Sequence, residues 1–141
     1  MESQDKQVIT VRTTIKAPID KVWKYWSDPS HITQWCYASD DWHAPKAEND
    51  LRTGGKFSTT MAAKDGSMSF DFGGVYTNVT APTVMEYTMG DGRTVKINFT
   101  AHGDETEVVE SFEPEAENPH EIQKGGWQAI LDNFKKYTET N

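Results

Sequence analysis

Residues 118–137, with the sequence NPHEIQKGGWQAILDNFKKY, dictate the architecture of this chain. Asn118 offers a side-chain oxygen as an N-cap, Pro119 suits the first helical position, and Glu121 lies three residues after the cap. These signals predict that a helix begins here. At about 3.6 residues per turn, its apolar residues cover about half of the helix surface. They are Ile122, Gly126, Trp127, Ile130, Leu131, Phe134 and Tyr137.

Such a face is wider than an ordinary surface helix needs, because an apolar stripe of roughly 100° suffices to cover a core. We therefore expect the helix to be held on several sides by a strongly curved sheet. A long helix that lies in a curved sheet often encloses a cavity. The pattern thus favours a protein that binds a small molecule.

The residues before this helix are predicted to be mainly β-structure. Alternating apolar residues and turn signals indicate seven strands. Two short helices lie between the first two strands; Ala17-Pro18 opens one, and Asp28 caps the other, which ends near Trp35. The fold class is therefore α+β, in the order β-α-α-β-β-β-β-β-β-α. The strands are predicted at residues 8–16, 42–51, 56–63, 67–79, 83–89, 93–101 and 105–113.

Glycine pairs mark the turns and one irregularity of the predicted sheet. Asp65-Gly66 and Asp91-Gly92 suit tight hairpins. Gly73-Gly74 interrupts the longest strand, which predicts a bulge or sharp bend. Asp50 and Arg52 share a strand face beside Gly54-Gly55, so we expect a salt-bridged corner rather than a site.

Composition fits a single domain over residues 1–141 with a polar tail at 1–7. The core relies on large side chains, since the chain has five Trp, five Tyr and six Phe. The net charge of −8 argues against nucleic acid and anionic membranes as partners. No apolar run reaches the length of a signal peptide core or a membrane span, so we expect no membrane insertion and a cytoplasmic location.

Little in the chain points to a metal or another cofactor. Cys36 is the one cysteine, so no internal disulfide forms, and it is expected to pack as a small hydrophobe. Four scattered histidines form no ligand cluster, so no metal is predicted. Gly73-Gly74 lacks the context of a phosphate loop. We therefore predict no cofactor and assign no catalytic residue.

Two features leave alternatives open. Glu110 lies between Val108 and Phe112 on an alternating strand and is either an inward polar anchor or general acid/base, or a residue turned to solvent or paired with Arg93 or Arg52. We favour the second alternative, in which Glu110 is turned to solvent or paired with an arginine. Gly125-Gly126 costs about 1 kcal/mol per glycine inside a helix. Close helix–sheet packing is the favoured explanation, and a gap used by a ligand or by helix flexing is the other.

The order of elements and several short motifs resemble a known family. The chain is similar to the START-related, birch-pollen-allergen-like (SRPBCC) superfamily, and within it to bacterial members of the group named after the C-terminal domain of the activator of the heat-shock ATPase. The resemblance covers residues 8–138 and implies a helix-grip fold, but no shared catalytic signature. The motifs are Ala17-Pro18 with Val22-Trp23, Trp35, Asp50-Leu51-Arg52 with Gly54-Gly55, Asp65-Gly66, Gly74-Val75-Tyr76, Asp91-Gly92-Arg93, Phe112 with Glu115, and Gly126-Trp127 with Leu131.

Three functions follow from these observations. The first is binding of a small hydrophobic ligand, such as a lipid, polyketide or aromatic metabolite, between the sheet and the last helix. The second is a cyclase- or hydrolase-type enzyme that uses the same cavity, which a carboxylate with a raised pKa would favour. The third, implied by the family's name, is a partner of the heat-shock ATPase chaperone. We expect no ATPase stimulation, because only seven polar residues precede the first strand, where eukaryotic activators carry a separate N-terminal domain.

The predicted ligand-binding residues are those whose strand or helix face points towards the expected cavity. They are Trp35, Phe57, Met61, Phe70, Phe72, Tyr87, Ile97, Phe99, Glu110, Trp127, Ile130, Leu131 and Phe134.

Overall fold

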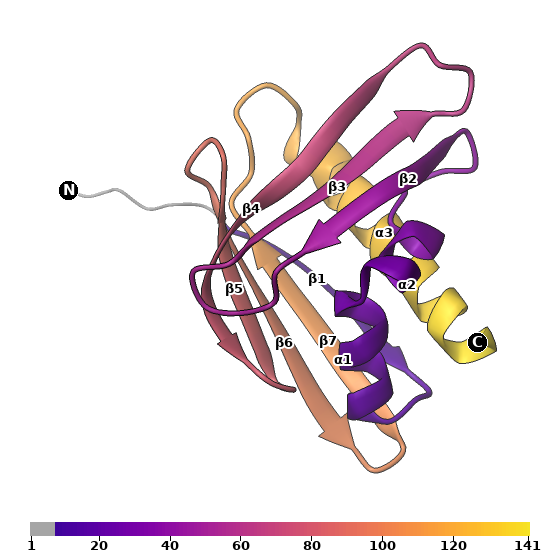
Figure 1. Cartoon of the computed structure of the whole chain (residues 1–141), viewed down its shortest axis with the longest axis vertical. Helices are drawn as coiled ribbons and strands as arrows, with labels where there is room; N and C mark the ends of the chain where they lie inside the picture. The colour runs from indigo at the N-terminus through magenta and orange to yellow at the C-terminus, as the bar shows by residue number, and fades with distance from the viewer. Residues whose placement is uncertain (1–7) are drawn as a thin grey trace.

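The computed structural model describes residues 8–141 and shows one curled sheet that holds a long helix (Figure 1). The tail predicted at residues 1–7 lies outside the described residues. All seven predicted strands are present, and their ends differ from the predicted ones by at most two residues. They are β1 (Ile9–Ile15), β2 (Trp42–Asn49), β3 (Lys56–Ala63), β4 (Ser69–Thr80), β5 (Val84–Met89), β6 (Thr94–His102) and β7 (Glu105–Phe112).

The seven strands form one antiparallel sheet in the order β1-β7-β6-β5-β4-β3-β2. The predicted α+β helix-grip architecture is therefore confirmed. Helices α1 (Ile19–Ser27) and α2 (Pro29–Trp35) connect β1 to β2, the two edges of the sheet. Helix α3 (His120–Thr140) lies along the concave side of the curled sheet (Figure 1).

A local capping signal explains the start of α2 but not that of α3. Asp28 caps α2, because its side chain accepts a hydrogen bond from the Ser30 backbone N–H at 2.9 Å. The predicted cap of α3 is wrong: the N-cap is Pro119, and the amide of Asn118 donates instead to the Glu115 carboxylate at 2.6 Å. The helix also turns Ile122 outward, 64% exposed, and buries Gln123 in its place.

The irregularity predicted in β4 lies elsewhere on the strand. Gly73 and Gly74 keep a continuous register with β3, and the bulge falls between Tyr76 and Asn78, opposite β5. A Cβ on Gly73 would clash with the Phe57 carbonyl oxygen, and one on Gly74 with the Thr88 carbonyl oxygen. These glycines therefore allow neighbouring strands to approach closely.

The predicted corner after β2 is confirmed. Arg52 Nε donates to both Asp50 carboxylate oxygens, at 3.0 and 2.9 Å. A Cβ on Gly55 would clash with the Asp50 carbonyl oxygen, so this position needs glycine. The corner joins the Gly55 and Tyr76 backbones and so fixes the start of β3 against β4.

The core fills one end of the curled sheet. Ile97, Phe99, Leu131 and Phe134 are at most 2% exposed. Trp35 and Trp26 pack edge-on against Phe134 with ring centroids 4.8 Å apart in both pairs. Thus α1 and α2 close this end of the sheet against the C-terminal half of α3.

Candidate functional site

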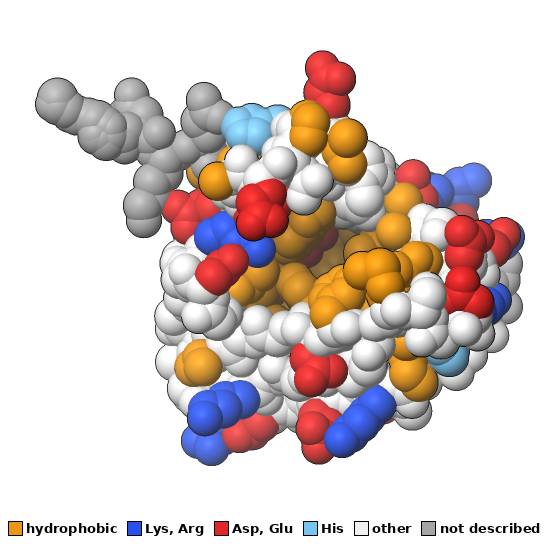
Figure 2. Space-filling view, turned by 90° about the horizontal axis from the view of Figure 1, so that it is seen from above, with side chains coloured by type: hydrophobic (Ala, Val, Ile, Leu, Met, Phe, Trp, Pro, Cys, Tyr) orange, Lys and Arg blue, Asp and Glu red, His pale blue; other side chains and the backbone are white. Residues whose placement is uncertain are grey.

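The other end of the curled sheet is hollow. A cavity of about 280 Å³ lies between β2–β5, β7 and the N-terminal half of α3. Figure 2 looks into this hollow and shows hydrophobic walls, with acidic and basic side chains on the rim. Because ligand sites commonly measure about 300–1,000 Å³, the volume suits a small molecule at the lower end of that range.

The structure brings nine of the thirteen predicted site residues to this cavity. They are Trp35, Phe57, Met61, Phe70, Phe72, Tyr87, Glu110, Trp127 and Ile130. The other four, Ile97, Phe99, Leu131 and Phe134, belong to the filled core and do not border the cavity. Strand alternation identifies an inward side chain but not whether its surroundings are filled.

Other lining residues were missing from the predicted set. Thr59 and Met85 share inward faces with predicted residues, so alternation could have identified them. Tyr76 has the alternation of Phe70 and Phe72 on β4, so the same signal could have identified it. Asn49 gave no such signal, because its role depends on a distant segment: the Tyr76 hydroxyl donates to Asn49 Oδ1 at 2.8 Å. The remaining missed residues are Trp26, Ile32, Cys36, Glu48, Arg93, Glu115 and Gln123.

Aromatic rings form most of the cavity wall. Phe57 meets Tyr87 edge-on at a centroid distance of 4.6 Å, and Phe72 meets Trp127 edge-on at 5.8 Å. Trp127 also stacks flat on Phe112 at 3.9 Å. The rings pack on one another, and the wall presents both ring faces and ring edges.

Glu110 points into the cavity. It is 5% exposed, and the register of β7 runs without a bulge past Val11 on one side and Ile97 on the other. The favoured prediction of a solvent-facing or Arg-paired Glu110 is therefore wrong. Arg52 bonds Asp50, Arg93 bonds Asp91, and no hydrogen bond or ion pair within residues 8–141 reaches the Glu110 side chain.

Burial controls the protonation of this part of the cavity. It raises the pKa of Glu110 to about 8, so the carboxyl is mainly protonated at neutral pH. Burial, with the Glu110 charge as a smaller cause, raises the pKa of the Cys36 thiol to about 12. The same two causes raise the pKa of Tyr87 well above its ordinary value. The cavity interior is therefore neutral and poorly solvated.

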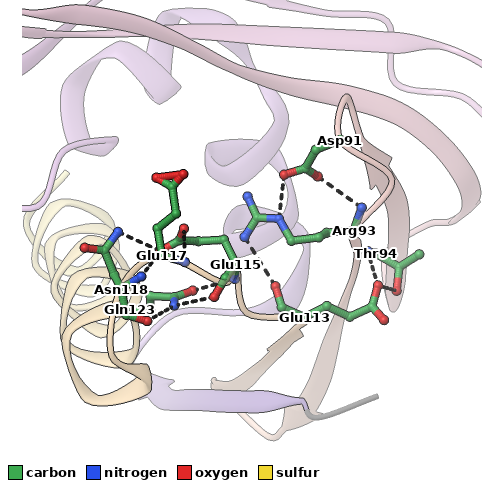
Figure 3. Close-up of polar contacts among 8 residues, drawn as sticks. All are labelled: Asp91, Arg93, Thr94, Glu113, Glu115, Glu117, Asn118 and Gln123. Carbon is green, nitrogen blue, oxygen red and sulfur yellow. Dashed lines mark hydrogen bonds and ion pairs between the residues drawn. The ribbon is translucent and has the colours of Figure 1, made fainter. Parts of the chain in front are cut away.

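A polar network orders the rim (Figure 3). Gln123 accepts from the Glu115 backbone N–H at 2.9 Å and donates to the carbonyl oxygens of Glu115 and Asn118 at 3.0 and 2.8 Å. On the neighbouring turn, Arg93 Nε donates to Asp91 at 2.7 Å. Gln123 thus fastens the segment before α3 to the helix and shapes one side of the mouth.

The glycines of α3 have open space around them. A Cβ added to Gly125 or Gly126 would have no heavy atom within 4 Å outside the local helix. Close helix–sheet packing, the favoured prediction, is therefore wrong for both glycines. Gly125 is exposed and neither glycine lines the cavity, so the alternative, a gap used by a ligand or by helix flexing, stays a prediction.

Two further structural findings concern the whole described chain. Within residues 8–141, no group of three or more His, Cys, Asp or Glu side chains is arranged to hold a metal ion. In the same range, no helix is both long and apolar enough to cross a bilayer.

A curled antiparallel sheet that grips a C-terminal helix around an aromatic cavity defines the START-related, birch-pollen-allergen-like class, and this fold is compatible with ligand binding. Comparison with known protein families assigns the chain to one family within this class. The model of the family described as Activator of Hsp90 ATPase homolog 1-like protein matches residues 16–139, and the chain belongs to this family.

Solved structures of bacterial proteins agree with this assignment. An AHSA1-like protein from Aeromonas hydrophila is 44% identical, with a TM-score of 0.89 over 95% of this chain and 93% of that chain. A protein from Cytophaga hutchinsonii is 63% identical, with a TM-score of 0.81 over 94% and 92% of the two chains. A Nitrosomonas europaea protein, 16% identical, has a TM-score of 0.81 over 98% and 97%, a likeness of fold alone. The search of curated proteins found no match.

Proposed function

We propose that this protein binds a small hydrophobic ligand in the cavity between the curled sheet and α3. One observation carries the proposal: about 280 Å³ stays unfilled beside a core whose other end is packed without exposed side chains. The apolar walls of this hollow are open to solvent (Figure 2), and exposed apolar surface is unfavourable by roughly 25 cal/mol per Å². A ligand that fills the void would recover part of that cost by burying apolar surface.

The size and walls of the cavity favour some ligands over others. The volume lies near the lower limit of ordinary ligand sites, which favours compact aromatic compounds over sterols and long-chain lipids. Rings such as Phe57, Phe72 and Trp127 would stack on or meet the edges of an aromatic ligand. Met61 and Met85 would adapt to its outline, because methionine side chains are flexible.

Thermal unfolding against aromatic metabolites, flavonoids, polyketides, fatty acids and sterols tests the proposal. A ligand at 100 times its Kd adds about 2.7 kcal/mol, which shifts Tm by roughly 5–10 °C in a domain of this size. Thr59→Phe places a ring inside the cavity and should abolish the shift, because Thr59 is a buried lining residue.

Thr60→Phe is the matched control for this experiment. Thr60 is the next residue on β3, does not line the cavity, and bonds Asp71 on the outer face of the sheet. The control should keep the ligand-induced shift. A ligand that shifts the parent and both variants equally binds elsewhere, and that result would refute the cavity as the site.

A second function, cyclase- or hydrolase-type catalysis in the same cavity, is favoured by one specific observation. Glu110 is buried, unpaired within the described residues and has a pKa of about 8, as suits a general acid. Against it, the raised pKa values of Cys36 and Tyr87 leave no activated nucleophile beside it. Mass spectrometry of the bound compound after incubation distinguishes the two functions, since a new product lost in Glu110→Gln indicates catalysis.

The family description names an activator of the Hsp90 ATPase, so a chaperone is the remaining candidate partner. No feature of the cavity requires a protein partner. If no compound shifts Tm, the binding of purified Hsp90 at micromolar concentration becomes the experiment that decides this candidate.

A further inference from the structure

We infer that the cavity selects an organic cation: a compact aromatic or aliphatic body that carries one protonated amine, which the Glu110 carboxylate receives. The inference rests on the proposed function and specifies the chemical class of its ligand. Four observations support it: the position of Glu110, the charges around the cavity, the aromatic wall and the limited volume.

Glu110 is a buried acid to which the protein gives no partner. Its side chain lines the cavity at 5% exposure, and no hydrogen bond or ion pair from residues 8–141 satisfies it. Buried polar groups in folded proteins almost always have a partner, so one that faces a cavity points to a group supplied from outside the chain. An ammonium group offers three donors and the opposite charge.

The other charges of the cavity disfavour an anionic ligand. The lining contains three carboxyl groups, from Glu48, Glu110 and Glu115, and a single guanidinium, from Arg93. The Nε of that guanidinium donates to the Asp91 carboxylate at 2.7 Å, and its Nη1 donates to the Glu113 carbonyl oxygen at 3.4 Å. The lining cation is therefore already paired with a carboxylate, and carboxyl groups outnumber cations three to one in the lining. The net charge of −8 adds a long-range attraction for cations.

The wall suits the body of such a cation. Trp35, Trp127, Phe57 and Phe72 line the cavity together with the Tyr87 ring. Aromatic faces attract cations through their negative quadrupole, and more strongly when the pair is desolvated. The same rings bury the apolar part of the ligand. A long acyl chain has no room in a cavity of about 280 Å³.

Binding an ammonium group changes the protonation of the site. Cys36, Tyr76 and Tyr87 face the cavity, and burial raises the pKa of all three, so they stay neutral at pH 7. Glu110, protonated in the free protein, would release its proton when the ammonium arrives, because an opposite charge favours the ionised carboxylate. Glu48, Glu115 and Arg93 complete the charged lining.

Three probes with one indole body test the inference: tryptamine, tryptophol and indoleacetic acid. They carry an ammonium, a hydroxyl and a carboxylate, respectively. Isothermal titration calorimetry at pH 7 should show the highest affinity for tryptamine and none for indoleacetic acid. Titrations in two buffers of different ionisation enthalpy should detect about one proton released with tryptamine and none with tryptophol, since only the amine ionises Glu110.

Glu110→Gln should weaken tryptamine binding by about tenfold to a hundredfold, because a charge-assisted hydrogen bond is lost. It should abolish the proton release and leave tryptophol affinity unchanged. Glu117→Gln is the matched control: it removes the same charge from an exposed residue that does not line the cavity, and should bind tryptamine as the parent does.

The outcomes separate this inference from the proposed function. If tryptophol or indoleacetic acid binds as tightly as tryptamine, or if Glu110→Gln binds all probes like the parent, the cation class is wrong and the cavity function stands. If no probe binds the parent, the proposed function itself fails for compact aromatic ligands, and the inference fails with it.

Discussion

The two halves of α3 belong to one continuous helix but meet different surroundings. In the C-terminal half, Leu131 and Phe134 have no exposed surface and pack against the filled end of the sheet. In the N-terminal half, Trp127 and Ile130 are half-buried and border the cavity, and the glycines before them adjoin open space. One half is therefore core, and the other is a cavity wall.

This difference shows how the fold combines stability with an unfilled volume. Native domains keep a net stability of only about 5–15 kcal/mol, so a void must be compensated by good packing elsewhere. Here Phe99 and Phe134 are fully buried at the filled end, where both pack edge-on against Trp26. The N-terminal half of α3 is then free to present side chains to a ligand.

The largest expected effect comes from the filled half. Phe134→Ala should cost about 3–5 kcal/mol, because it removes a fully buried ring and leaves a new void. Ile130→Ala, one turn earlier, should cost less than about 2 kcal/mol, the lower end for such changes, since Ile130 already borders empty space. Urea unfolding of both variants measures the difference. Equal losses would show that the two halves are packed alike.

The next effect concerns the pH dependence of stability. The Glu110 pKa is about 8 when folded and 4.5 as the ordinary value, so the folded protein holds a proton that the unfolded chain has released. Stability should therefore fall as pH rises from 4.5 to 8, by about 1.4 kcal/mol per unit, and level off above 8. Glu110→Gln cannot ionise and should be roughly 3 kcal/mol more stable than the parent at pH 7.

The comparison between parent and variant isolates Glu110 from other acids. Hydrogen bonds lower the pKa values of Asp28, Glu115 and Glu139, so these groups add stability as pH rises through the acid range, but they are shared by both proteins. The unfolding free energies of the parent and of Glu110→Gln should coincide near pH 4. They should diverge as the pH rises, with the variant the more stable of the two. Parallel curves from pH 4 to 8 would contradict the burial of an unpaired Glu110.

How far the sequence predicts this molecule depends on whether a signal is local. Alternation and Asp-Gly turns are local, and they located all seven strands. Alternation also pointed to an inward Glu110 between Val108 and Phe112, but the favoured prediction was a solvent-facing or Arg-paired side chain, and it was wrong. The start of α3 followed to within one residue, but its cap did not, because the Asn118 side chain bonds the Glu115 carboxylate instead of capping the helix. Such partners depend on where the chain folds back.

Local sequence signals also could not predict which inward residues line the cavity and which are packed in the core. Phe72 and Phe99 both occupy inward positions of alternating strands, yet one lines the cavity and the other is fully packed. Their packing partners differ: Phe99 meets Trp23 and Trp26 of α1 edge-on, at 5.3 and 5.8 Å, whereas Phe72 meets Trp127 of α3 beside the cavity. These partners come from segments distant in sequence, so alternation along one strand does not reveal them.

The smallest expected effect tests the open half of the helix. Gly126→Ala should stabilise the protein by about 0.5–1 kcal/mol, because alanine favours the helix and its methyl group enters open space. Gly73→Ala is the contrasting glycine and should destabilise, since its methyl group would clash with the Phe57 carbonyl oxygen. Thermal unfolding compares the two. A loss of stability in Gly126→Ala would mean that this half of α3 is packed after all, whereas a gain in stability with weaker ligand binding would show that the gap beside the glycine belongs to the site.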